Sequence, residues 1–147
     1  MIEMTAKVKW HLDEKALIEA VQKAIIEPLE KCALLVEGSA KESMKQGGRS
    51  AGPRGGKKQT PSTPGNPPNV QSGNMRGSIR IQKTERKTFI VGPTRMALYA
   101  KAHEYGGRHH PKRPFMRPAL LRMIRKFPDQ FKNLQLKRFF RGSNKPQ

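Results

Sequence analysis

The chain has 147 residues, a single-domain length, and only 35% of them are apolar, which is low for a compact domain. Its formal charge is +19: residues 1–46 hold 7 Lys or Arg and 8 Asp or Glu, and residues 47–147 hold 23 and 3. One cysteine excludes an intramolecular disulfide, and we expect no secretory leader and no membrane span. The cationic surface predicts an anionic partner: nucleic acid, an anionic membrane or an acidic protein.

Residues 6–12 alternate between apolar and polar side chains, which predicts a half-buried strand. Asp13 is a suitable N-cap for a long amphipathic helix that runs to about Met44 and ends at Gly47 and Gly48. Pro28 lies inside this helix and is expected to kink it. The helix has an apolar stripe with spacings of three and four residues: Leu17, Val21, Ile25, Leu29, Cys32 and Val36.

Residues 46–73 contain 7 Gly and 5 Pro and no acidic residue. Such a composition buries little apolar surface, so we expect a flexible basic loop over residues 46–72 and a second flexible segment at the tail, 142–147. The basic residues of the loop are Arg49, Arg54, Lys57 and Lys58.

A hairpin is predicted after the loop. Ser72 is placed to cap a single helical turn over residues 73–77. Residues 78–83 and 87–91 then alternate as two strands, and Gly92 with Pro93 closes the hairpin.

The stretch from Tyr99 to Leu121 has the pattern of a turn between two packed elements. Residues 99–105 have helical spacing, and we expect that helix to bury Tyr99 and Tyr105. Gly106 and Gly107 can end it in a left-handed conformation. Pro118 suits the first turn of a new helix, where its missing N–H costs nothing.

The second long helix is predicted to begin at Pro118 and to be kinked at Pro128. Its expected core stripe is Leu120, Ile124, Phe127, Phe131 and Leu134. The predicted fold is a single α+β domain over residues 1–147, with a small antiparallel sheet, made of the N-terminal strand and the hairpin, packed by two long helices.

No pattern of catalytic or metal-binding residues is complete. Gly56 and Lys57 approach a phosphate-binding loop, but Ala51 stands where its first glycine is needed. His103 and Glu104 begin like a zinc-protease helix that lacks its second histidine, and Cys32 lies on an apolar stripe. We therefore expect a non-enzymatic protein without metal or cofactor.

Several short motifs occur in a fixed order that resembles the tail-completion (neck) proteins of long-tailed double-stranded-DNA bacteriophages. Met75 and Gly107 depart from the family pattern, where Leu and Thr are usual. The matching residues are Ser72, Gly73, Arg76, Ser78 and Ile79, then Val91 and Gly92, then Tyr99, Ala100, Glu104 and Gly106, then Pro114, Phe115, Pro118 and Ala119.

The resemblance implies a structural protein of the virion, assembled in the host cytoplasm. In that family the protein forms a homo-oligomeric ring, a hexamer by resemblance, that completes the tail and contacts the head connector and the tail tube proteins. It implies no membrane partner. The basic surface then either lines the lumen, touching DNA without sequence specificity, or meets acidic neighbours. The alternative is a cytoplasmic basic protein that binds nucleic acid without sequence specificity, and a remoter one is a small RNA nuclease.

Five residues of the central stretch are the candidates for oligomer or partner contacts. Two roles for Glu104 stay open at this point: an ion pair with Lys101 or Arg108, or a contact between subunits. The five candidates are Tyr99, Glu104, Gly106, Phe115 and Pro118.

Overall fold

The computed structural model describes residues 14–45, 49–51, 57–85, 88–94, 97–132 and 134. Its elements in chain order are α1 (Glu14–Ser43), β1 (Arg49–Ala51), β2 (Lys57–Gln59), α2 (Asn74–Ser78), β3 (Ile79–Lys83), β4 (Phe89–Pro93), α3 (Ala100–Tyr105), α4 (Met116–Met123), the 3₁₀ turn η2 (Ile124–Lys126) and α5 (Phe127–Phe131).

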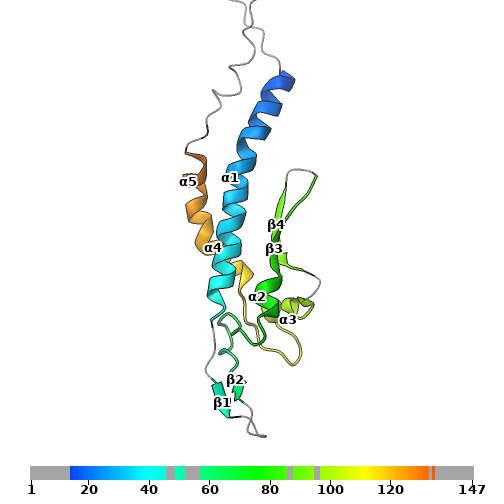
Figure 1. Ribbon diagram of the computed structural model, residues 1–147, viewed down its shortest axis with the longest axis vertical. Helices are drawn as coiled ribbons and strands as arrows, with labels where there is room; N and C mark the ends of the chain where they lie inside the picture. Colours follow the sequence, from blue (N-terminus) through cyan, green and yellow to red (C-terminus); the bar gives the residue numbers. More distant parts are fainter. Residues whose placement is uncertain are drawn as a thin grey trace, which may run out of the picture.

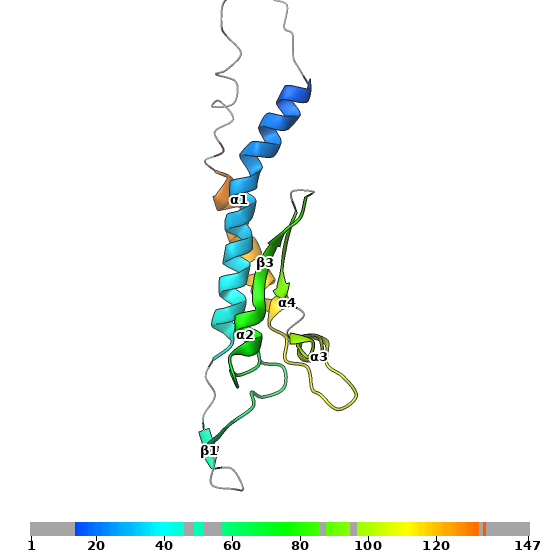
Figure 2. The ribbon, with the colours of Figure 1, turned by 45° about the vertical axis from the view of Figure 1, so that its right-hand side comes forward.

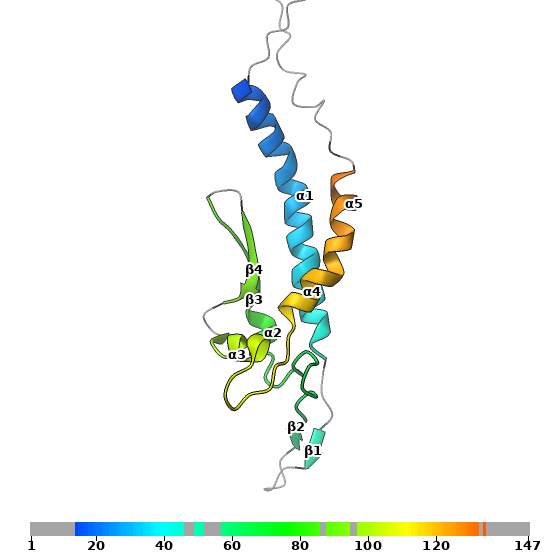
Figure 3. The same ribbon diagram turned by 180° about the vertical axis from the view of Figure 1, so that it is seen from behind.

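Helix α1 is the spine of an elongated molecule. The β3–β4 hairpin lies along one side of it, and the run α4–η2–α5 lies along another (Figures 1 and 3). The fold is thus α+β: a long helix packs against a two-stranded antiparallel hairpin and a 16-residue helical run. The predicted strand at residues 6–12 lies outside the described residues.

The amphipathic pattern predicted α1 correctly, and Pro28 lies within it. Figure 2 shows its N-terminal half leaning away from the axis of its C-terminal half. Cys32 and Val36 of the predicted stripe are buried, whereas its earlier members are only half-buried. The apolar face of α1 is therefore covered mainly in its C-terminal half. Asp13, Gly47 and Gly48, the predicted ends, lie outside the described residues.

The hairpin confirms the predicted alternation. Ile79 pairs with Pro93, and Ile81 with Val91, in an antiparallel register. Ile79 is completely buried, while Ile90, on the opposite face of β4, is exposed. Strand β4 thus continues through Gly92 and Pro93, which were expected to close the hairpin.

The core lies where the C-terminal end of α1 meets α2, the base of the hairpin, α3 and the start of α4 (Figure 2). Phe115 and Ile79 are its largest fully buried side chains. Four of its eight buried members are alanines, which allow close approach of the backbones. The fully buried core is consequently small.

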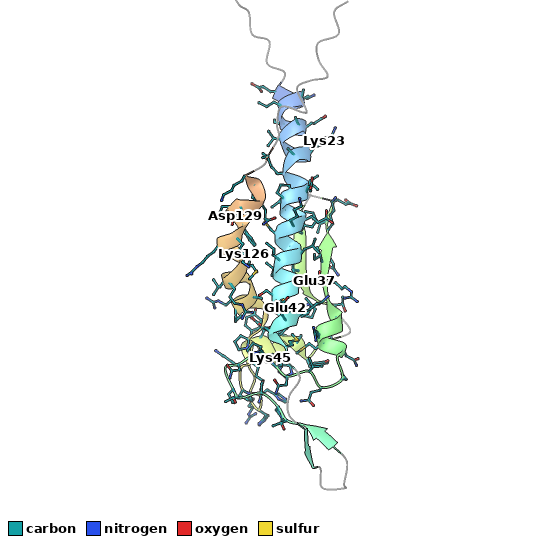
Figure 4. The ribbon with its side chains drawn as sticks, turned by 60° about the vertical axis from the view of Figure 1, so that its left-hand side comes forward. Lys23, Glu37, Glu42, Lys45, Lys126 and Asp129 are labelled. Carbon is teal, nitrogen blue, oxygen red and sulfur yellow. The ribbon has the colours of Figure 1, made fainter. Side chains whose placement is uncertain are left out.

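The C-terminal helix begins two residues earlier than predicted, at Met116. In a regular α-helix the Ile124 carbonyl would accept a hydrogen bond from residue 128, but Pro128 has no N–H. The Phe127 N–H donates to that carbonyl instead, and the chain forms the 3₁₀ turn η2 just before Pro128. The prediction of a buried stripe is wrong in its first half: Leu120 is 42% exposed and Ile124 is 49% exposed, so the described elements cover these side chains only in part. Figure 4 shows the charged residues Lys126 and Asp129 on this run, which lies beside α1, and Glu37 and Glu42 on α1.

The predicted basic loop contains structure that the sequence pattern did not indicate. Strands β1 and β2 pair antiparallel, with Arg49 opposite Gln59. After β2, the Val70 N–H donates to the Lys45 carbonyl at 2.8 Å, which ties the loop to the end of α1. Whether the loop is flexible stays a prediction, and residues 142–147 lie outside the described residues.

Candidate functional site

Glu104 caps the N-terminus of α4 from eleven residues away. Its Oε2 accepts hydrogen bonds from the N–H groups of Phe115 at 2.8 Å and Met116 at 3.0 Å. Its Oε1 accepts one from Arg117 N–H at 2.9 Å. The fourth donor that a helix start leaves unpaired is missing here, because the next residue is Pro118. All four positions are thus accounted for by one carboxylate and one proline.

This cap also provides the negative charge that a helix N-terminus favours. Neither Lys101 nor Arg108 forms an ion pair with Glu104 in the described structure, so the cap takes the place of the first of the two roles left open, and the contact between subunits stays a prediction. The sequence held one clue: Phe115, at the N-cap position, has no oxygen to offer, so the helix needs an acceptor from elsewhere.

Gly106 ends α3 as predicted, but in a different conformation. Its N–H donates to the Ala102 carbonyl, and its φ of 80° and ψ of 175° place it outside the left-handed helical region. That combination is essentially restricted to glycine. A Cβ at this position would lie 2.8 Å from Cγ of Lys112. Position 106 therefore favours glycine for two reasons: its backbone conformation, and the close approach of Lys112 where the loop folds back.

The basic loop after Gly106 folds back on itself and is held at its end. Gly107 and His110 exchange two backbone hydrogen bonds, of 2.9 and 3.2 Å. Arg113 N–H then donates to the His103 carbonyl at 2.7 Å, and Arg113 Nε donates to the Ser62 carbonyl at 3.0 Å. Arg113 thus joins the Pro/Gly-rich segment, helix α3 and the start of α4. Sequence reasoning missed this role, since no local pattern marks it.

The expectation that α3 buries two tyrosines is wrong. Tyr99 is 46% exposed and Tyr105 is 69% exposed. The helix instead turns its small residue Ala100 to the core, where neighbouring backbones leave little room. Tyr99 packs its ring edge to face with His103, with 6.0 Å between ring centroids.

The five candidate residues therefore divide into two groups. Glu104, Gly106, Phe115 and Pro118 build one corner inside the subunit, with Phe115 only 1% exposed at its centre. Tyr99, which is 46% exposed, is the most exposed of the five. The candidates of the basic loop are not brought to this corner by any described contact. Arg49, Lys57 and Lys58 lie on β1 and β2, and Arg54 lies outside the described residues.

An apolar groove of about 1110 Å³ lies beside the corner, between α1, β4 and α4. Its walls include Cys32 and Val36 of α1, Phe89 of β4, Leu120 of α4 and Phe127 of α5. Burial raises the pKa of the Cys32 thiol, which supports the view of this cysteine as a small apolar residue. The groove offers apolar surface without an evident set of reactive groups.

No protein-family model matches this chain, and no curated protein or solved structure matches it either. The described residues hold no group of three or more His, Cys, Asp or Glu side chains arranged to bind a metal ion. Within the same residues, no helix combines the length and apolar character that crossing a membrane requires.

Proposed function

We propose that this chain is a non-enzymatic structural subunit of the bacteriophage neck, which completes the tail and joins it to the head connector as a homo-oligomeric ring. The observation that carries the proposal is the Glu104 cap. It links the Tyr-Ala-x-x-x-Glu-x-Gly motif to the Pro-Phe-x-x-Pro-Ala motif. Two of the four pieces on which the family resemblance depends are thus joined in one corner of the fold.

Exposed apolar surface supports an oligomeric subunit. Leu120, Leu121 and Ile124 are all more than 40% exposed on one helical run, and Leu120 also lines the groove. A contiguous apolar surface of this kind is typical of interaction sites. A closed ring needs two different surfaces that meet at a fixed angle. The groove, with Leu120 in its wall, and the face of the helical run that carries Leu121 and Ile124 are two such surfaces.

The N-terminal segment is proposed to complete the sheet. Thirteen residues precede α1, and a strand of that length spans about 43 Å. From Glu14 to Leu29, the first groove residue of α1, the helix rises about 22 Å. The predicted strand, residues 6–12, accounts for about 23 Å of that reach, so when it folds back along α1 its Ala6 end comes level with Leu29, and there it is proposed to join the two-stranded hairpin, which is marginal alone.

Inactivating the gene in the phage or prophage that encodes it tests the function. We expect filled heads and free, complete tails by electron microscopy, with joining restored when the intact chain is supplied from a plasmid. Normal joined particles without the chain would refute the proposal. They would favour the alternative, a basic protein that binds nucleic acid without sequence specificity.

A further inference from the structure

A second pocket, of about 280 Å³, lies on the other side of α3 from the capped corner. It is formed where the Pro/Gly-rich segment before α2 meets α3 and Arg113. Two hydrogen bonds hold these parts together: Arg113 Nε to the Ser62 carbonyl, and Gly65 N–H to the Lys112 carbonyl at 2.7 Å. The wall of the pocket is therefore built by residues far apart in the sequence.

The lining of this pocket suits an anion. It includes Arg76, His103 and Arg113, and none of the fourteen described residues that line it is acidic. Glu104, the acid closest in sequence, lines the apolar groove and is occupied by the helix cap. The hydroxyl of Ser62 is buried without a hydrogen-bond partner in the described structure, which leaves one more donor for a ligand.

The pocket also carries aromatic surface. Tyr99 lines it and is 46% exposed, and its ring meets His103 edge to face. Proteins that bind single-stranded nucleic acid commonly combine two features: cationic side chains that contact the phosphates, and aromatic rings that stack on the bases. A free phosphate ion would contact the cationic side chains but not the Tyr99 ring.

We propose that this pocket binds one nucleotide of a single-stranded nucleic acid, with Arg76 and Arg113 at the phosphate and Tyr99 against the base. The pocket lies within one subunit, so binding does not require ring assembly. Arg76 is the residue to test, because it is exposed on α2, whereas Arg113 also holds the fold together. Burial, then the charges of Arg113 and His110, lowers the pKa of His103 below its ordinary value. A bound phosphodiester should raise that pKa again.

The experiment measures binding of the oligonucleotide (dT)₈ to the full chain, with NMR titration of His103 as the second readout. Arg76→Gln should weaken binding about tenfold and lower the salt slope by about one. The matched control Arg125→Gln removes an exposed arginine of η2 that does not line the pocket, and should change affinity less than twofold. Tyr99→Leu should weaken binding several-fold, while Tyr105→Leu should not.

The expected result for His103 is an upward pKa shift on adding (dT)₈, reduced in Arg76→Gln. Equal losses for Arg76→Gln and Arg125→Gln would overturn the proposal, because binding would then follow net charge alone. An unchanged His103 pKa with bound (dT)₈ would overturn it as well. If sulfate shifts His103 and (dT)₈ does not, the pocket takes free anions, and the assignment to nucleic acid is wrong.

Discussion

Replacing Glu104 by alanine should destabilise the protein more than any other loss of one exposed or half-buried carboxylate. The change leaves three N–H groups without their acceptor, of which those of Phe115 and Met116 are partly buried. A hydrogen bond to a charged group contributes about 1.5–3 kcal/mol, and water can replace the exposed bond to Arg117. With two bonds lost in full and some relaxation, the free energy of unfolding should fall by about 3 kcal/mol.

Glu104→Gln separates the shape of the cap from its charge. The amide keeps one oxygen to accept hydrogen bonds, but its NH₂ group faces a backbone donor, so we expect a loss of about 1–2 kcal/mol. Glu30, an exposed carboxylate of α1, is the matched control, and Glu30→Ala should change stability by less than about 0.5 kcal/mol. Urea unfolding followed by circular dichroism measures all three. A loss under about 0.5 kcal/mol for Glu104→Ala would refute the cap as the link between the two motifs.

Three further predictions concern the turn, the surface and pH. Gly106→Val should cost about 1–3 kcal/mol and abolish tail joining, because φ is 80° there. Gly107→Val, at a site with open space, should cost far less in the same urea assay. Leu121→Asp, at a side chain that is 58% exposed, should leave stability unchanged yet prevent ring formation in sedimentation velocity, and intact rings would refute α4 as an interface. Since burial lowers the pKa of His103, the unfolded chain takes up its proton first, so stability should fall as pH drops below about 6.5. His103→Gln should make the urea midpoint depend less on pH below about 6.5. The same pH dependence in His103→Gln as in the unsubstituted protein would contradict this prediction.

Periodicity was sufficient to predict the elements in which apolar residues recur at regular spacing, such as α1, or alternate along two neighbouring strands, as in the hairpin. The stripe containing Cys32 and Val36 located α1, and the alternation at Ile79, Ile81 and Ile90 located the hairpin and its faces. These patterns are set by local geometry, which the sequence carries directly.

Burial and long-range contacts were predicted poorly, because they depend on what lies across from a residue. Tyr105 has the spacing of a core residue but the described elements leave it mostly exposed, and they cover Ile124 only in part. The Glu104 cap and the Arg113 contact to Ser62 join residues 11 to 51 positions apart. Nothing in a local window indicates such pairs. The sequence motifs pointed to the residues of the capped corner, but the hydrogen bonds of Glu104 that join them are seen only in the structure.

Cryo-electron microscopy of the phage particles, with the chain carrying a small epitope tag, tests the central claim most directly. The account predicts one closed ring of copies at the top of the tail, in contact with the head connector, with Leu121 and Ile124 of one copy at the groove of the next. Particles whose necks lack the chain would contradict the claim, as would copies that lie elsewhere in the particle.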